Sequence, residues 1–110
     1  MTEKPASVHC GTVIDDIREI AKEHGYAIGV HGSLVRDIDL IAIPWSKDAH
    51  SALTLRRAIR KLYYILDYKD QSDGGKPHGR KAWLFHISHR AQGCPQHVDL
   101  SVMPRAQDRP

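Results

Sequence analysis

The chain is poor in the features that mark secreted, disulfide-stabilised and membrane-spanning proteins. It has two cysteines, one phenylalanine and an aromatic fraction of 6%. Cys10 and Cys94 form no C-x-x-C pair, so free thiols are expected rather than a structural disulfide. No apolar run approaches the length of a membrane span, and the opening stretch MTEKPASVHC lacks the apolar segment of a signal peptide. We therefore expect a cytoplasmic protein with no membrane partner.

Two common catalytic signatures are also missing. The chain contains neither the G-x-S-x-G turn of many serine hydrolases nor a long Walker-type phosphate loop. Its formal charge of +3 tolerates an anionic ligand but does not by itself indicate a nucleic-acid-binding protein. The length of 110 residues predicts a single domain, residues 1–110, with an ordered core over about residues 12–105 and one functional site.

Hydrophobic periodicity predicts two helices. In the first, apolar residues recur at helical spacing from Val13 to Ala21, Thr12 caps the start, and Gly25 provides a left-handed stop. The second helix is predicted over Asp48–Tyr68. Its apolar stripe comprises Ala52, Leu55, Ile59, Leu62 and Leu66. Its opposite side carries Arg56, Arg57, Arg60 and Lys61. Such a basic side is typical of a solvated helix surface and, less often, of a nucleic-acid contact.

Four strands complete the predicted domain. They are Tyr26–His31, Ile38–Pro44, Lys81–Ser88 and Gln96–Met103. With the helices they give the order αββαββ, which predicts an α+β fold with a small mixed β-sheet and both helices packed on one side. The polar segments Met1–Gly11 and Arg105–Pro110 are predicted to be loosely held.

Acidic residues accompany two of the predicted strands. Asp37 and Asp39 stand at the start of the isoleucine-rich strand and, because strand side chains alternate, project from one face roughly 7 Å apart. Asp99, in V-D-L-S on the last strand, mirrors this pair. Three carboxylates on neighbouring strands can hold one or two divalent cations, and oxygen ligands suit Mg²⁺ or Mn²⁺. The alternative is that these acids are merely solvated, or paired with Arg36.

The residues Gly32-Ser33, Asp37-Ile38-Asp39 and Asp99 resemble the G-S, D-x-D and later-strand Asp of the DNA polymerase beta-like nucleotidyltransferase superfamily, in particular its smallest members. The resemblance implies that Gly32 and Ser33 hold a triphosphate and that Asp37 and Asp39 bind metal ions. It further implies that Asp99 completes the first metal site and helps to deprotonate an acceptor hydroxyl. The implied activity is metal-dependent nucleotidyl transfer from a nucleoside triphosphate to RNA, a protein or a small molecule.

The spacing departs from that superfamily in one place. Only Leu34-Val35-Arg36 separate G-S from D-x-D, which shortens the segment that faces the phosphates. Gly32 and Ser33 are therefore also compatible with the bend of a β-hairpin. The chain is similar as well to small uncharacterised phage and prophage proteins. Two other functions remain open: a catalytically silent nucleotide- or partner-binding module with the same fold, and a metal-dependent nuclease that uses the same acids.

Two further sets of polar residues are candidates for binding. The segment Lys69–Arg80, KDQSDGGKPHGR, is predicted to be a mobile loop whose cations contact nucleotide phosphates, with a plain connector as the alternative. These cations are Lys76, His78 and Arg80. A possible zinc set surrounds the last turn and comprises His86, His89, Cys94 and His97. Eight histidines in so short a chain make scattered surface histidines the preferred interpretation.

Overall fold

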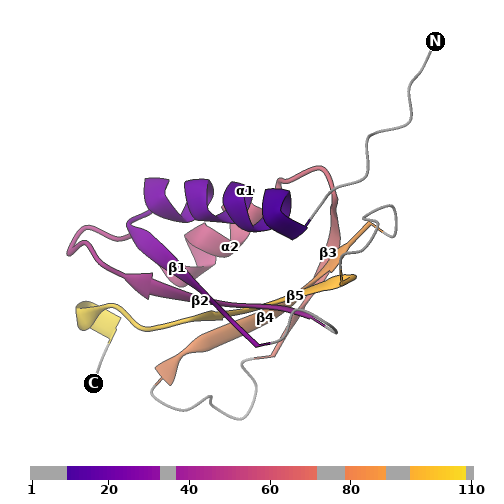
Figure 1. The fold of residues 1–110 in the computed structure, drawn as a ribbon. Helices are drawn as coiled ribbons and strands as arrows, with labels where there is room; N and C mark the ends of the chain where they lie inside the picture. Colours follow the sequence, from indigo (N-terminus) through magenta and orange to yellow (C-terminus); the bar gives the residue numbers. More distant parts are fainter. Residues whose placement is uncertain (1–9, 33–36, 72–78, 89–94, 109–110) are drawn as a thin grey trace.

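Two helices cover one face of a five-stranded β-sheet in the computed structural model of the protein (Figure 1). The structure describes residues 10–32, 37–71, 79–88 and 95–108. Its helices are α1 (Cys10–Glu23), α2 (Ala52–Arg60) and the short 3-10 helix η2 (Ala106–Asp108). Its strands are β1 (Tyr26–His31), β2 (Ile38–Pro44), β3 (Ile65–Asp70), β4 (Lys81–Ile87) and β5 (His97–Val102). Across these described ranges, no helix combines the length and the apolar character needed to cross a membrane.

The sheet is mixed, as predicted, and its strand order is β1-β2-β5-β4-β3. The central pair, β2 and β5, is parallel, while the other neighbouring pairs are antiparallel. In the parallel pair Ile38 lies opposite Val98, Asp39 opposite Asp99 and Leu40 opposite Leu100. The two similar sequences, I-D-L and V-D-L, therefore lie side by side in register at the centre of the sheet.

Alternation along the central strands separates a buried face from a polar one. The buried residues, each at most 1% exposed, are Ile38, Leu40, Ala42, Val98, Leu100 and Val102. They pack with the apolar side of α1, whose Val13, Ile17 and Ala21 are fully buried. Each buried valine, leucine or isoleucine side chain contributes about 1.5–3 kcal/mol through burial. Successive strand residues point to opposite faces, so Asp39 and Asp99 lie on the face that points away from the helices. We call this the polar face.

The predicted second helix was too long, and the predicted order αββαββ was wrong by one strand. Helix α2 ends at Arg60, and β3 follows and pairs with β4 at the edge of the sheet. The guanidinium of Arg60 donates hydrogen bonds to the carbonyls of Ile65 and Leu66, which closes the turn between helix and strand. Leu66, expected to be buried, is 54% exposed. Residues four apart lie on one side of both a helix and a strand, so the Leu62–Leu66 spacing does not distinguish them.

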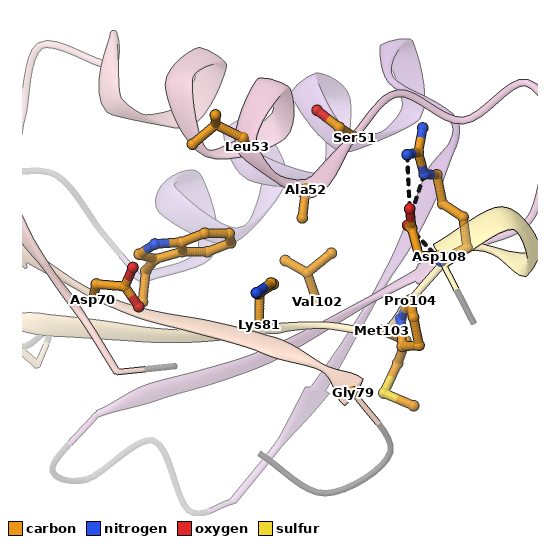
Figure 2. Close-up of a pocket in the computed structure, with 12 residues that line it drawn as sticks. Ser51, Ala52, Leu53, Asp70, Gly79, Lys81, Val102, Met103, Pro104 and Asp108 are labelled. Carbon is orange, nitrogen blue, oxygen red and sulfur yellow. Dashed lines mark hydrogen bonds and ion pairs between the residues drawn. The ribbon is translucent and has the colours of Figure 1, made fainter. Parts of the chain in front are cut away.

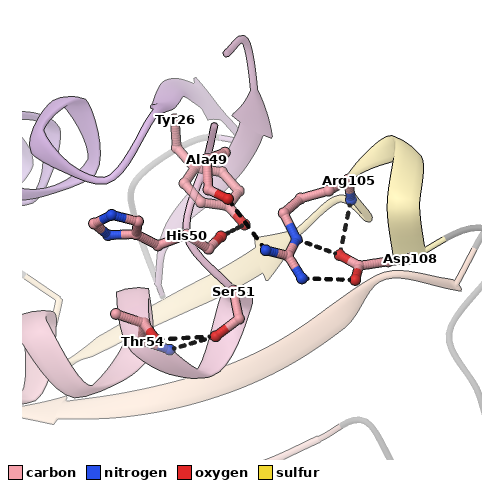
Figure 3. Close-up of polar contacts among 7 residues, drawn as sticks. All are labelled: Tyr26, Ala49, His50, Ser51, Thr54, Arg105 and Asp108. Atoms are coloured by element: carbon pink, nitrogen blue, oxygen red, sulfur yellow. Dashed lines mark hydrogen bonds and ion pairs between the residues drawn. The ribbon is translucent and has the colours of Figure 1, made fainter. Parts of the chain in front are cut away.

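Two predictions at the ends of the domain were also wrong. Helix α1 already includes Cys10 and Gly11, so Thr12 does not cap it, although Gly25 has the expected positive φ of 86°. Residues 105–108 are held in place rather than loose. The Arg105 guanidinium donates to both carboxylate oxygens of Asp108, at 2.8 and 2.9 Å, and to the Ala49 carbonyl at 3.1 Å (Figure 3).

Candidate metal centre on the polar face

The three predicted acids converge on the polar face. Asp37 directly precedes β2, Asp39 lies in β2, and Asp99 lies opposite Asp39 in β5. One carboxylate oxygen of each residue lies within 4.8 Å of the corresponding oxygens of the other two, and all three residues are half-buried. The parallel register of the two strands produces this convergence, because it aligns residues 60 positions apart in the chain. The acidic triad could hold a metal ion.

The geometry of the triad fits a hard divalent cation. Two oxygens bound on opposite sides of one Mg²⁺ are about 4.2 Å apart, since each bond is about 2.1 Å long. The largest separation in the triad is 4.8 Å or less, so small side-chain rotations bring the oxygens onto a shared ion. An all-oxygen donor set favours magnesium, manganese or calcium over softer metals.

Gly32 lies against this triad. Its φ is +80°, a left-handed conformation that glycine adopts without strain, and a Cβ at this position would lie 2.5 Å from Oδ2 of Asp39. Position 32 therefore requires glycine, because another residue would be strained at this φ and its Cβ would collide with the Asp39 carboxylate. Strands β1 and β2 pair as antiparallel neighbours, with His31 opposite Asp39, as in the hairpin that the short spacing allowed. Ser33, the other predicted triphosphate ligand, lies outside the described residues.

A row of side chains from β3, β4 and β5 leads across the sheet to the triad. Oδ1 of Asp67 lies 2.6 Å from Nδ1 of His86, and the rings of His86 and His97 have centroids 4.4 Å apart. Nδ1 of His97 in turn lies 3.8 Å from Oδ1 of Asp37. The sequence interpretation missed this row, because Asp67 was assigned to a helix and the cross-strand register is not visible in the sequence.

The zinc set is only partly described. His86 and His97 are neighbours on the polar face, whereas His89 and Cys94 lie outside the described residues. Among the described residues, one group of at least three potential metal ligands lies close enough to share an ion. It consists of Asp37, Asp39 and Asp99. The described geometry therefore favours an oxygen-ligand site.

The predicted phosphate-binding cations are also partly outside the described residues. Lys76 and His78 belong to residues 72–78, whereas Arg80 is described and directly precedes β4. Arg80 is half-buried, and its Nε is buried without a hydrogen-bond partner in the described structure. The predicted start of the loop was wrong, because Lys69 and Asp70 belong to β3.

Two of the four cations on the basic side of α2 make contacts within the protein. The Arg56 guanidinium carbon lies 4.5 Å above the Tyr68 ring, and Arg60 binds the carbonyls that follow the helix. Arg57 and Lys61 remain exposed. These contacts give the basic side a structural role and weaken its interpretation as a nucleic-acid surface.

A cavity of about 590 Å³ lies between the start of α2 and the sheet (Figure 2). It is lined by the start of α2, including Ser51 and Leu53, and by Lys81, Val102 and Met103 at the far ends of β4 and β5. None of the three acids lines it. The cavity is therefore not a pocket that opens onto the candidate metal centre.

No protein-family model matches the chain, and no curated protein is significantly similar to it in sequence. The likeness to the nucleotidyltransferase superfamily thus rests on the G-S, D-x-D and later-strand Asp residues alone.

Proposed function

We propose that the protein transfers a nucleotidyl group from a nucleoside triphosphate to an acceptor hydroxyl, with Mg²⁺ or Mn²⁺ bound by the acidic triad. The observation that carries this proposal is the convergence of Asp37, Asp39 and Asp99 within 4.8 Å of one another. Carboxylates in this arrangement suit one or two hard cations. Bound divalent ions polarise a phosphoryl oxygen and stabilise the charge that develops on the departing pyrophosphate.

The residues of the chain would act as follows. Asp37 and Asp39 hold the cations, and Asp99 completes the site and accepts the proton of the acceptor hydroxyl. The acceptor oxygen then forms a bond to the α-phosphorus, the bond from the α-phosphorus to the bridging oxygen breaks, and pyrophosphate leaves. Because Gly32 has no side chain, its backbone comes close to the Asp39 carboxylate.

Cations would complete the triphosphate site. Arg80 is one candidate, and its buried Nε has no hydrogen-bond partner in the described structure. Lys81 pairs with Val102 and Leu84 with Asp99, so Arg80 lies beyond the end of β4 that is away from the triad. A contact with Arg80 therefore requires the phosphates to extend from the triad toward that end of the sheet. An arginine offers several donors to phosphate oxygens. Ser33 and Lys76 stay candidates from the sequence. The acceptor class stays open among RNA, a protein and a small molecule.

The test offers the purified protein labelled ATP, CTP, GTP and UTP with Mg²⁺ or Mn²⁺, together with RNA and protein acceptors. Covalently attached label is the expected product. Asp39→Asn should abolish it because the amide keeps the shape of the side chain but removes the charge that holds the ion. Asp48→Asn is the matched control, since Asp48 is an exposed acid that does not belong to the triad.

Three other outcomes would redirect the proposal. Attachment that persists in Asp39→Asn would reject the metal role of the triad. Metal-dependent cleavage of RNA or DNA without transfer would favour a nuclease. Nucleotide binding without transfer to any acceptor would favour a catalytically silent binding module.

A further inference from the structure

Trp45 is a large aromatic side chain that stands on the surface directly after β2. It is 66% exposed, whereas the other tryptophan, Trp83, is 3% exposed. Trp45 lines two separate hollows, one of about 380 Å³ and one of about 300 Å³. The remaining lining of the two hollows comes from different parts of the chain, so the indole lies between them.

Both hollows are bordered by positive charge. Arg18 and Lys22, four residues apart on α1, line the larger hollow, and Lys47 lines the smaller one. In the described part of the chain these three cations take part in no ion pair. Arg105 also lines the smaller hollow, but its charge is balanced by Asp108.

The backbone that carries Trp45 is firmly held. The N–H of Trp45 donates to the Gly25 carbonyl at 3.1 Å, which joins it to the end of α1. In the turn that follows, the Ala49 carbonyl accepts from Arg105 at 3.1 Å and the His50 carbonyl accepts from the Tyr26 hydroxyl at 2.7 Å (Figure 3). Exposure of the indole is therefore a property of an ordered surface, and a ligand would meet a preorganised ring.

We propose that Trp45, Arg18, Lys22 and Lys47 bind single-stranded nucleic acid. A base stacks on the exposed indole, and the neighbouring phosphates contact the cations that border the hollows. Such sites combine an aromatic platform with a basic groove and tolerate many sequences, because every base has a stacking face. The charges on either side of the ring favour a polyanion over an apolar peptide.

This surface is separate from the candidate metal centre. Trp45 follows the last residue of β2, whereas Asp39 is the second residue of that strand and lies near its other end. The proposal therefore does not depend on nucleotidyl transfer. Asp39→Asn should leave nucleic-acid binding unchanged, so failure of one proposal can be distinguished from failure of the other.

The experiment measures the tryptophan fluorescence of the protein while oligo(dT) or oligo(U) of about 15 nucleotides is added at low salt. Trp83 is buried, so a saturable quench reports on Trp45. For variants that lack the indole, the anisotropy of a fluorescein-labelled oligonucleotide gives the affinity. Trp45→Ala should weaken binding by about 10-fold or more, and three phosphate contacts predict a slope near −2 for log K against log salt.

Charge-reversal variants distinguish binding at the Trp45 surface from general attraction of the nucleic acid to a positively charged protein. The double variant Arg18→Glu/Lys22→Glu should weaken binding and reduce the salt slope. The matched control is Arg57→Glu/Lys61→Glu, which makes the same change in net charge at the end of α2 and should have a much smaller effect. Circular dichroism and melting curves check that each variant is folded.

Three results would overturn the proposal. They are the absence of a saturable quench with either oligonucleotide, equal weakening by both double variants, and tighter binding to vesicles of anionic lipid than to the oligonucleotides. The last result would mark the same cations as a contact for a lipid surface.

Discussion

Asp39→Asn should stabilise the metal-free protein and remove its response to divalent cations. The wild-type triad places three carboxylates within 4.8 Å of one another, and like charges at this distance repel. Asparagine has nearly the same shape as aspartate, so the substitution removes charge and leaves the packing of β2 intact. The free energy of unfolding of the metal-free protein should therefore rise.

The size of the effect follows from the separations. Two unit charges 4.8 Å apart repel by about 0.9 kcal/mol at the dielectric constant of water, and by more where water is partly excluded. Asp39 takes part in two of the three pairs, so its neutralisation relieves about 1–2 kcal/mol once screening at this half-exposed site is included. For a domain of this size that corresponds to a rise in melting temperature of about 5 °C or more.

The assay compares melting curves of wild type, Asp39→Asn and the control Asp48→Asn across a titration of Mg²⁺ or Mn²⁺, with and without nucleotide. An ion that binds only the folded state stabilises it by about 2.7 kcal/mol at 100 times its Kd. Wild type and the control should show this rise, and Asp39→Asn should not. The reasoning is refuted if metal-free Asp39→Asn melts below wild type, or if all three proteins respond equally to metal.

Three further substitutions test other parts of the structure. Gly32→Ala should lower stability by about 1–2 kcal/mol and weaken Mn²⁺ binding, because the new methyl group would push the Asp39 carboxylate away; melting curves and metal titration measure both. Ile59→Ala should cost about 2–5 kcal/mol in denaturant unfolding, whereas Leu66→Ala should cost less than about 1 kcal/mol. Burial raises the pKa of the Tyr26 hydroxyl, so the folded protein resists its ionisation and should lose stability as the pH rises above 10.0. Tyr26→Phe should remove that loss. At neutral pH it should cost about 1 kcal/mol, because the hydrogen bond from the Tyr26 hydroxyl to the His50 carbonyl is lost.

Each of these substitutions has an internal control. Gly11→Ala lies on α1 where a new methyl group meets no atom within 4 Å, so it should not destabilise the protein. Equal losses of unfolding free energy in Ile59→Ala and Leu66→Ala would contradict a helix α2 that ends at Arg60. Such a result would support the longer helix that the sequence predicted. Tyr63 is 72% exposed, and Tyr63→Phe should leave the alkaline unfolding profile unchanged.

Short-range patterns in the sequence predicted most of the secondary structure. The isoleucine-rich apolar run from Ile38 to Pro44 identified β2, and the period-two alternation around Leu100 identified β5 and the face on which Asp99 lies. Such patterns work because a strand buried on one face must place apolar residues at every second position. These patterns failed after Arg60, where β3 lies at the edge of the sheet. Every residue of β3 after Ile65 is exposed. An edge strand with little buried surface leaves a weak periodic signal.

The sequence by itself determined the residue types of the candidate site, the glycine at position 32 and the side of each strand on which the acids project. These are local properties, because alternation and backbone conformation depend on near neighbours. Only the tertiary structure decided that β2 and β5 pair in parallel, which brings Asp39 opposite Asp99, and that Asp67, His86 and His97 form a row leading to Asp37. Strand order and register depend on how the whole chain buries its apolar surface, and contacts between residues far apart in the chain leave no fixed spacing in the sequence.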